Sequence, residues 1–494
     1  MIKLHNTLTR SIDTFTPIDS KKVSLYTCGP TVYDHLHVGN WAAYIYWDIL
    51  VRTLLAHGYH VERVMNITDV GHLVSDADEG EDKLEKGASR EGKSAWDIAE
   101  YYAEDFMQGM ELLGMIPPEH VVRATEFIPQ QLDLIRLLKE KGYTYQTDDG
   151  IYFDTSKFPR YANFAHLDLE AQKAGARVEQ NTSKRQPWDF AIWKFTPKDK
   201  TRDMQWATPA DLLDSPLNEG QEVMGFPGWH LECSAIAMSI LGPTIDLHTG
   251  GIDHIPVHHT NEIAQSEAAS EQPFAHYWLH NNHIKIDGGK VSKSLGNGYT
   301  LQDISARGYL AMDLRMFVLQ GQFTNEGNFT FDNLAAAHNR LANWKNYAAL
   351  RHQTHDSLND DDEKSDKDMY VSLIAGGSAI REALGNNLNT PEALRVVDES
   401  FARLDGVPLN KIHRHGLLEF LEDIDELLGL QLIATTPDIN DDAKRLMIER
   451  ARARDSKDWS ASDSLREKLL EDHRIIVNDT PSGVTWSYAL YKTV

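Results

Sequence analysis

Hydrophobic and polar positions near the start of the chain predict a strand, a helix and a second strand. Residues 23–28 (VSLYTC) form a short apolar run that a Gly-Pro pair ends, as expected of a buried strand. A helix is predicted from Gly39–Asn40 to Gly58, a glycine suited to the residue just after a helix. A second strand follows at 61–67. A strand, helix and strand at this spacing predict a right-handed crossover and a parallel sheet.

The same pattern returns later in the chain. A helix is predicted at 229–241, a strand at 244–249 and a further helix at 259–270. Two such units separated along the chain predict a split nucleotide-binding fold, in which the residues between them form an insertion. A strand at 150–156 (GIYFDTS) is predicted inside this insertion.

Beyond residue 300 the apolar spacing becomes that of helices. A charge-rich segment, 357–368, interrupts these helices, and 434–442 has the composition of a linker before a small final unit. We therefore predict an α/β fold with five segments: the first half of the nucleotide-binding domain (1–115), the connective insertion (116–225), the second half (226–325), a helical bundle (326–433) and a small C-terminal α+β unit (434–494).

Charge and composition restrict the location and partners. No run of 18 apolar residues is present and the first residues lack the apolar core of a signal peptide, so we expect a cytoplasmic protein without a membrane span. The net charge is −25, which disfavours indiscriminate binding to polyanions. A nucleic-acid partner would therefore need local basic patches. Residues 444–454 provide one, with five cations and a single glutamate.

The two cysteines, Cys28 and Cys233, lie far apart in a long chain, which does not form a disulfide framework. Cys28 ends the first predicted strand, at the edge where parallel sheets bind ligands. His258 and Glu262 are four residues apart on a predicted helix and share one face. Two thiolates, an imidazole and a carboxylate can form a tetrahedral zinc site. Ordinary buried cysteines remain the alternative, and His259 remains an alternative to His258.

Two further segments have the composition of phosphate-binding sites. HVGN (37–40) lies in a predicted strand-to-helix turn, where free N–H groups and the helix dipole favour anions. Residues 287–297 (DGGKVSKSLGN) place two lysines and two serines between glycines. Mobile lysines can stabilise the charge that develops on phosphate during transfer, although a solvated surface loop has the same composition.

These segments together resemble the cysteinyl-tRNA synthetase family of class I aminoacyl-tRNA synthetases. HVGN is similar to the first class I signature, HIGH, and KVSKS (290–294) to the second, KMSKS. The resemblance extends along nearly the whole chain. It includes NITD (66–69), GWHLECSA (228–235), GGID (250–253), HHTNEIAQSEA (258–268), ARDSKDWSASDSLREKLL (453–470) and NDTPSGVTW (478–486).

The resemblance implies a Rossmann-like class I catalytic domain, ATP-dependent activation of L-cysteine and transfer to tRNA-Cys. It also implies that one Zn²⁺ is held per chain, that Mg²⁺ accompanies ATP, and that the last unit reads the anticodon. We expect a monomer. The implied zinc ligands are Cys28, Cys233, His258 and Glu262. The implied cysteine pocket comprises Gly29, Thr68, Trp229, His248 and Asp253. The implied ATP-binding residues are Gly29, His37, Gly39, Asn40, Gly251, Asp253 and Lys293, among which His37, Asn40 and Lys293, with Lys290, are catalytic. The implied tRNA contacts are Arg454, Trp459, Asp463 and Asp479.

Some positions depart from the family pattern. A Lys-rich segment usually follows NITD, whereas this chain has an acidic segment at 70–88. Val257 replaces a usual proline and Thr260 a usual glutamate, although neither is an expected ligand. Two alternatives to a tRNA ligase are a cysteine ligase of the mycothiol type, which lacks the anticodon unit as a rule, and a non-catalytic zinc-bearing paralogue that binds tRNA or senses the amino acid.

Overall fold

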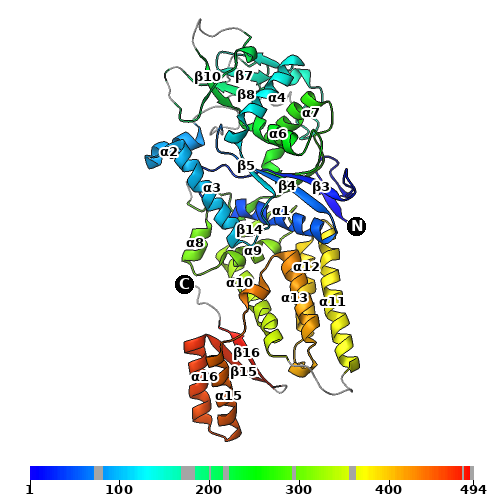
Figure 1. The fold of residues 1–494 in the computed structure, drawn as a ribbon, viewed down its shortest axis with the longest axis vertical. Helices are drawn as coiled ribbons and strands as arrows, with labels where there is room; N and C mark the ends of the chain where they lie inside the picture. The colour runs from blue at the N-terminus through cyan, green and yellow to red at the C-terminus, as the bar shows by residue number, and fades with distance from the viewer. Residues whose placement is uncertain are drawn as a thin grey trace.

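The computed structural model describes residues 1–71, 82–167, 184–197, 199, 202–214, 222–291, 296–354, 363–480 and 483–489. The molecule is elongated (Figure 1). An antiparallel sheet lies at one end, a parallel sheet near the middle, and helices with a small C-terminal unit at the other end. No helix among these described residues is long and apolar enough to cross a membrane. Part of the acidic segment 70–88 and part of the charge-rich segment 357–368 lie outside the described residues.

The central sheet has five strands in the order β12-β11-β3-β4-β5, and every neighbouring pair is parallel. The strands are β3 (Lys22–Thr27), β4 (His60–Ile67), β5 (His120–Arg123), β11 (Ile245–Gly251) and β12 (Ala275–Asn281). The parallel sheet and the strands predicted at 23–28, 61–67 and 244–249 are confirmed. The sequence placed β5 inside the insertion, but β5 pairs with β4, so the insertion begins after this strand rather than at residue 116.

Helices cover both faces of this sheet. α1 (Val38–Ala56) packs on the face that carries Val23 and Leu25, and α6 (Trp229–Ile240) packs on the face that carries Tyr26. The other helices of this half are α2 (Lys83–Glu91), α3 (Ala95–Leu112), α4 (Ile128–Glu140), α7 (Thr260–Ser270), α8 (Leu301–Ala306) and α9 (Ala311–Leu319). The predicted end of α1 is confirmed, since Gly58 has a φ of 85°.

The insertion forms the second five-stranded sheet, with the order β6-β7-β8-β10-β9. Its strands are β6 (Thr144–Gln146), β7 (Gly150–Phe153), β8 (Phe190–Phe195), β9 (Trp206–Ala207) and β10 (Met224–Pro227). β7 confirms the strand predicted in this region, and its neighbours run antiparallel to it. Two-stranded pairs are formed by β1 (Lys3–Asn6) with β2 (Ser11–Thr14) and by β13 (Ile284–Ile286) with β14 (Gly327–Phe329).

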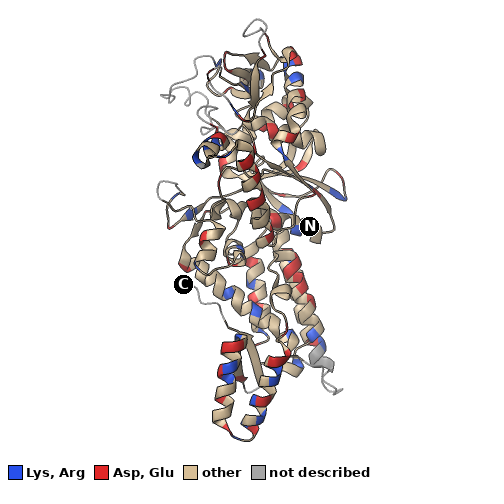
Figure 2. Ribbon diagram, turned by 60° about the vertical axis from the view of Figure 1, so that its left-hand side comes forward, with Lys and Arg blue, Asp and Glu red and all other residues tan. Residues whose placement is uncertain are grey.

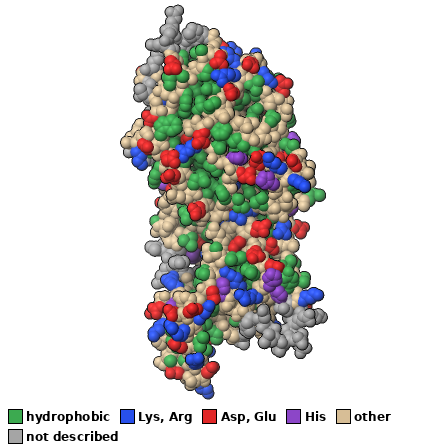
Figure 3. Space-filling model, in the orientation of Figure 1, with side chains coloured by type: hydrophobic (Ala, Val, Ile, Leu, Met, Phe, Trp, Pro, Cys, Tyr) green, Lys and Arg blue, Asp and Glu red, His purple; other side chains and the backbone are tan. Residues whose placement is uncertain are grey.

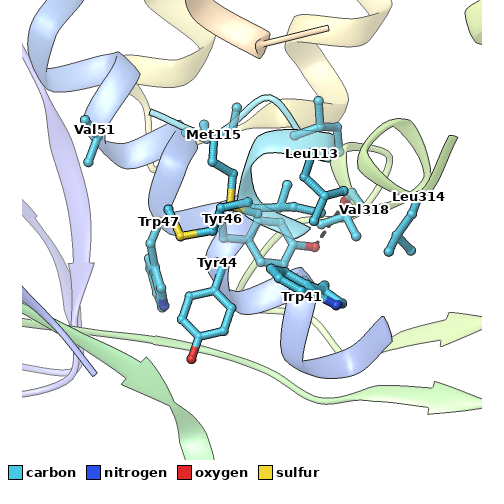
Figure 4. Packing of buried hydrophobic residues seen from close by; sticks show 14 of the residues in the cluster. Trp41, Tyr44, Tyr46, Trp47, Val51, Leu113, Met115, Leu314 and Val318 are labelled. Carbon is cyan, nitrogen blue, oxygen red and sulfur yellow. Dashed lines mark hydrogen bonds between the residues drawn. The ribbon is translucent and has the colours of Figure 1, made fainter. Parts of the chain in front are cut away.

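Aromatic residues of α1 join the sheet to the helices that follow it. Figure 4 shows Trp41, Tyr44, Tyr46 and Trp47 packed with Leu113, Met115, Leu314 and Val318. The Tyr46 hydroxyl donates a hydrogen bond to the Val318 carbonyl at 3.2 Å. Because such rings each remove a large apolar area from water, α1 is held firmly between the parallel sheet and α9.

A buried ionic cluster fixes the helical bundle to α1. Asp48 accepts hydrogen bonds from Arg52 and from Arg315, and all three side chains are buried. The two guanidinium groups also donate to the last carbonyls of α13 (Arg414–Leu428), those of Asp425, Glu426 and Leu428. Carbonyls at a helix C-terminus have no partner within the helix and carry partial negative charge. The cluster therefore satisfies the end of α13 and joins it to the half of the molecule that contains the parallel sheet.

The bundle leads into the C-terminal unit. It contains α10 (Phe331–Ala349), α11 (Glu363–Gly385), α12 (Thr390–Ala402), α13 and the short α14 (Leu432–Thr435). The C-terminal unit consists of α15 (Asp441–Asp455), α16 (Trp459–His473) and an antiparallel pair, β15 (Ile475–Thr480) with β16 (Gly483–Tyr488). Its small core includes Ala349 of α10, and the Trp486 backbone exchanges two hydrogen bonds with Gln353. The unit therefore packs directly on the end of α10.

Candidate metal centre and active site

The carboxyl edge of the parallel sheet gathers the chemically active side chains. Cys28 follows β3, Thr68 follows β4, and His248 lies in the middle of β11. Cys233 projects from α6 on the same side, and Glu262 from α7. Cys28, Cys233, His248 and Glu262 are all buried. Ligands of open α/β sheets bind at this edge. The position of these side chains therefore agrees with the site expected from the sequence.

Cys28, Cys233, His258 and Glu262 can face one ion. Each offers one donor atom, and these four atoms all lie within 4.8 Å of one another. His258 Nε2 is 3.6 Å from Glu262 Oε1. The other ring nitrogen of His258, Nδ1, is 3.1 Å from Nδ1 of His230. A neighbour on the second nitrogen orients the ring and leaves Nε2 toward the centre.

A second set of donors converges on the same place. Cys28, His248, His259 and Glu262 also satisfy the 4.8 Å limit. His259 Nε2 lies 3.4 Å from the Cys28 sulfur, and His248 Nε2 lies 3.2 Å from Glu262. Cys28 and Glu262 belong to both sets. The geometry alone therefore allows either Cys233 with His258 or His248 with His259 to be the other two ligands.

Local backbone structure explains why two neighbouring histidines reach the centre. His258 and His259 end a π-helical turn, Ile255–His259, that runs directly into α7. Such wider turns occur frequently at functional sites. At Gly250 an added Cβ would lie 2.6 Å from the His259 ring and 2.7 Å from the His254 ring. A residue without a side chain at this position therefore lets both rings pack against the end of β11.

The two cysteines respond differently to this environment. Burial opposes ionisation of Cys28, but the hydrogen bond with Cys233 and the charges of His259 and His248 outweigh it and hold the pKa of Cys28 well below its usual value. Burial and the negative charge of Cys28 raise the pKa of Cys233 well above its usual value. Two adjacent thiolates and a buried carboxylate repel one another, and a bound divalent cation would remove this repulsion.

The residues expected to contact cysteine surround this centre. Trp229 stacks on His258 with ring centroids 4.5 Å apart. Gly29 approaches β4 so closely that a Cβ would lie 1.5 Å from the Asn66 carbonyl oxygen. Thr68 is buried beside this strand, and His248 is packed on Trp278 with centroids 4.5 Å apart. Asp253 is exposed beyond the end of β11. Four of the five expected residues therefore adjoin the buried centre, while Asp253 lies at its exposed margin.

Reasoning from the sequence missed two residues of this pocket. Asn66 accepts a hydrogen bond from the Gly29 N–H at 2.8 Å. Glu232 accepts hydrogen bonds from Asn66 Nδ2 at 3.2 Å and from the Thr68 hydroxyl. Burial raises the pKa of Glu232 well above its usual value, although the Thr68 hydrogen bond opposes this shift. A glutamate in the apolar stretch before Cys233 was the available signal.

Among the described residues, the first predicted signature, 37–40, lies beside residues that follow the second predicted signature in the chain. The Val38 N–H donates to the Tyr299 carbonyl at 2.8 Å, and His37 forms an isolated bridge with Thr300. Lys290, ahead of this segment, is exposed, and its carbonyl accepts a hydrogen bond from Asn297 at 3.2 Å. Lys293 lies outside the described residues. The described parts thus bring the first signature to the end of the loop that contains the second.

His37 has a more defined role than the sequence indicated. Its Nδ1 accepts hydrogen bonds from the N–H groups of Gly39 and Asn40, and the Asn40 side chain accepts from the His37 N–H. His37 is therefore the N-cap of α1, and these N–H groups are already partly satisfied. Because Nδ1 accepts, the proton of neutral His37 resides on Nε2.

Two family models match this chain. Residues 14–339 match the family described as "tRNA synthetases class I (C) catalytic domain", and residues 436–486 match the "Cysteinyl-tRNA ligase anticodon binding domain". The cysteine--tRNA ligase of Treponema denticola is 38% identical over 98% of this chain and 99% of that protein. Cysteine--tRNA ligase 1 of Burkholderia lata is 41% identical over 98% of this chain and 96% of that protein.

The chain belongs to the cysteine--tRNA ligase family. Solved class I synthetases share its fold at much lower identity. A Mycobacterium tuberculosis methionyl-tRNA synthetase in complex with methionyl-adenylate has a TM-score of 0.59 at 13% identity, covering 83% of this chain and 92% of that one. The predicted fold class, a class I catalytic domain followed by helices and an anticodon-binding domain, is confirmed.

The anticodon-binding domain groups three of the four residues expected to contact tRNA. The Arg454 guanidinium lies 5.6 Å from the centre of the Trp459 ring and 3.1 Å from Asp479. Trp459 is 57% exposed. Asp463 is also exposed, on α16. Arg450, which the sequence did not single out as a contact, is buried and donates two hydrogen bonds to Asp479.

The basic patch predicted at 444–454 is largely neutralised by nearby carboxylates. Lys444 pairs with Asp438 at 2.6 Å, Arg445 pairs with Asp442, and Arg450 and Arg454 both pair with Asp479. Arg452 is the cation of this stretch for which the described residues provide no ion pair. Figure 2 shows basic and acidic residues interspersed along the helices of this unit, and Figure 3 shows their side chains interspersed on one face of it. The net charge counted along the sequence therefore overstates the patch.

Proposed function

We propose that the chain activates L-cysteine with ATP and transfers it to tRNA-Cys, and that one zinc ion at Cys28, Cys233, His258 and Glu262 identifies the thiol. The activity rests on the family to which the chain belongs. The observation that carries the zinc proposal is the convergence of four buried donor atoms within 4.8 Å of one another.

These donors suit zinc chemically. Zn–S bonds of about 2.3 Å and Zn–N bonds of about 2.0 Å would place tetrahedral ligands roughly 3.3–3.8 Å apart. Distances near His258 and Glu262 are already of this size, at 3.6 Å. Two thiolates with an imidazole and a carboxylate also match the preference of zinc for sulfur and nitrogen ligands.

We prefer the ligand set with Cys233 and His258, because it also explains the contacts of His259 and His248. With those ligands, His259 would donate to the Cys28 sulfur from 3.4 Å, and His248 would donate to Glu262 from 3.2 Å. His259 is itself held by His280, whose Nε2 lies 2.7 Å from His259 Nδ1. Outer partners of this kind orient metal ligands and adjust their basicity.

The site would separate cysteine from serine, which differ only in sulfur and oxygen. An apolar pocket separates such near-isosteres poorly, by roughly 100-fold. A bound zinc ion lowers the pKa of a thiol and binds the thiolate far more strongly than it binds a hydroxyl. Four protein ligands usually mark a closed structural site, so the substrate needs a fifth position or a weakly held ligand. We assign the weak bond to Glu262, because His248 can hold its carboxylate in place.

The other residues would position the reactants. Trp229 and Gly29 would enclose the amino acid, and Thr68 would face its polar groups, with Asp253 at the entrance. His37, Asn40, Lys290 and Lys293 would stabilise charge on the phosphates while the cysteine carboxylate attacks the α-phosphorus and pyrophosphate leaves. Gly39 and Gly251 would let the nucleotide approach the backbone, and Mg²⁺ would accompany ATP. Arg454, Trp459, Asp463 and Asp479 would contact the anticodon, and we predict a monomer.

Two matched variants test which donors bind the metal. Cys233→Ser removes a ligand of the preferred set, and His248→Gln removes a ligand of the alternative set. We expect Cys233→Ser to lose its zinc and its cysteine-dependent pyrophosphate exchange, and His248→Gln to keep one zinc per chain. The reverse result would assign the alternative set. Retention of zinc and activity by both variants would refute the zinc proposal.

A separate assay distinguishes the rival functions. Pyrophosphate exchange with cysteine would be absent from a non-catalytic paralogue. A mycothiol-type ligase would show exchange but would not charge tRNA-Cys. We expect both exchange and charging, because the chain has both class I signatures and a match to the anticodon-binding domain.

A further inference from the structure

Glu232 lies at the junction of the segments that form the cysteine pocket. It is 2% exposed and occupies the first turn of α6, between Trp229 and Cys233. The side chain points toward the end of β4, where it meets Asn66 and Thr68. None of the described cations lies within salt-bridge distance of its carboxyl group. A buried acidic group without a cation is costly, so a role in binding is a better explanation than a contribution to stability.

Hydrogen bonds from this carboxyl group fix the direction of the Thr68 hydroxyl. The hydroxyl donates its only proton to Glu232 Oε1. It also accepts a hydrogen bond from Asn66 Nδ2 at 3.0 Å. A hydroxyl has one donor and two acceptor positions, so a single acceptor position remains. Thr68 can therefore accept a hydrogen bond from a substrate but cannot donate one.

The same network fixes the backbone on the opposite side of the pocket. Asn66 Oδ1 accepts from the Gly29 N–H at 2.8 Å, and the Thr68 N–H donates to the Pro30 carbonyl at 3.0 Å. Glu232 thus connects α6, which carries Cys233, to the strand ends that carry Gly29 and Thr68.

We propose that Glu232 is a positioning residue that holds Thr68 as a hydrogen-bond acceptor for the α-ammonium group of the substrate cysteine. An acceptor facing this site suits an ammonium group, which can only donate, and not a carboxylate, which can only accept. The proposal rests on the proposed function, because it takes cysteine as the ligand and Thr68 as part of its pocket. It assigns to Glu232 the recognition of the amino group, separate from the recognition of the thiol by the metal.

The test compares Glu232→Met, which retains length and volume but cannot accept, with Glu232→Gln, whose carbonyl oxygen can still accept. Hydrogen bonds to charged groups contribute about 1.5–3 kcal/mol, which corresponds to roughly 10- to 150-fold in affinity. We expect Glu232→Met to raise the KM for cysteine in pyrophosphate exchange by roughly this factor. The KM for ATP and the zinc content should remain unchanged, and Glu232→Gln should remain within about threefold of the parent.

A substrate analogue separates positioning from a general structural effect. 3-Mercaptopropionate has the thiol and carboxylate of cysteine but no ammonium group. Its inhibition constant should be the same for the parent and for Glu232→Met. Equal weakening of cysteine and of this analogue, or loss of zinc from Glu232→Met, would overturn the proposal.

Thr68→Val distinguishes failure of this inference from failure of the pocket itself. We expect Thr68→Val to raise the cysteine KM at least as much as Glu232→Met, and the double variant to match Thr68→Val, because Glu232 acts only through the Thr68 hydroxyl. Additive effects would overturn the role of Glu232 while leaving Thr68 in the pocket. An unchanged cysteine KM in Thr68→Val would show that the proposed pocket is itself wrong.

Discussion

The catalytic half and the C-terminal unit use charged residues in opposite ways. In the catalytic half several acidic groups are buried, among them Glu262, Glu232 and Asp48. In the C-terminal unit the pairs Lys444–Asp438 and Arg445–Asp442 are exposed, and the aromatic residue expected to contact tRNA, Trp459, is 57% exposed. An enclosed site can identify a small thiol because water is excluded and each contact is strong. An open surface suits a large ligand such as a nucleic-acid base, which supplies its own apolar face.

The largest expected effect concerns the buried charges. Asp48→Asn would leave Arg52 and Arg315 buried without a carboxylate, and breaking a buried ion pair in this way costs about 3–5 kcal/mol. The catalytic half should therefore unfold at a clearly lower temperature. Asp438→Asn is the matched control, since it breaks an exposed pair with Lys444, and should leave the melting curve unchanged. Equal effects of the two variants would remove the distinction between the regions.

Asp48 also predicts a pH dependence. Burial opposes its ionisation, but Arg315 and Arg52 hold its pKa below the usual value. A carboxyl group with a lowered pKa in the folded state contributes stability above its unfolded pKa of about 3.9. That contribution is lost as the pH falls through the folded pKa. The difference in melting temperature between the parent and Asp48→Asn should therefore be constant near pH 7 and shrink below about pH 4.

The next effect concerns the first step of the reaction alone. His37→Ala removes both the cap of α1 and the Nε2 donor at the phosphate site. We expect the kcat of pyrophosphate exchange to fall by roughly 100- to 1000-fold, the range for loss of one donor that stabilises developing charge. Zinc content should not change, because His37 lies outside both sets of possible ligands. An equal loss for His35→Ala, a neighbour paired with Asp105 at 2.9 Å, would indicate disruption of the loop instead.

A smaller effect should appear only with tRNA. Trp459→Ala removes the exposed ring at the Arg454–Asp479 pair. Base stacking on an aromatic side chain contributes about 1–3 kcal/mol, so the KM for tRNA-Cys should rise by roughly tenfold or more. Cysteine-dependent pyrophosphate exchange without tRNA should match the parent. A parallel fall in pyrophosphate exchange would contradict the separation of the two regions.

The smallest effects should distinguish paired from unpaired cations. Arg452→Ala should weaken tRNA binding and reduce the slope of log K against log salt by about 1, because one phosphate contact is lost. Arg445→Ala should change tRNA binding by less than about twofold, because Asp442 already pairs with this side chain and exposed pairs contribute little. Binding titrations at several salt concentrations measure both. The opposite ranking would show that the ion pairs of α15 open when tRNA binds.

Much of the fold could be predicted because its signals are local. The strands at 23–28 and 61–67 and the helix between them follow from continuous apolar runs and from glycine at the helix end. The predicted insertion wrongly includes β5, because HVVR at 120–123 is too short to show a period. Its place is determined by pairing with β4, which is a tertiary contact.

The sequence predicts the site only from its residue types and from the segments that resemble the family. The four expected zinc ligands do lie together, but the sequence could not show that His248 and His259 form a second set with Cys28 and Glu262. The hydrogen bonds of Glu232 connect residues 164 and 166 positions apart, and no local pattern contains such a link. The neutralisation of Arg450 and Arg454 depends in the same way on Asp479, in a strand beyond α16.

The central claim is that the metal at Cys28, Cys233, His258 and Glu262 binds the sulfur of the substrate. The most direct test replaces zinc by cobalt(II), whose bonds to thiolates give strong charge-transfer absorption. L-Cysteine should raise this absorption to a saturating value, and L-serine at the same concentration should leave it unchanged. If cysteine is activated without any rise in this absorption, or if serine produces the same rise, the metal does not read the thiol.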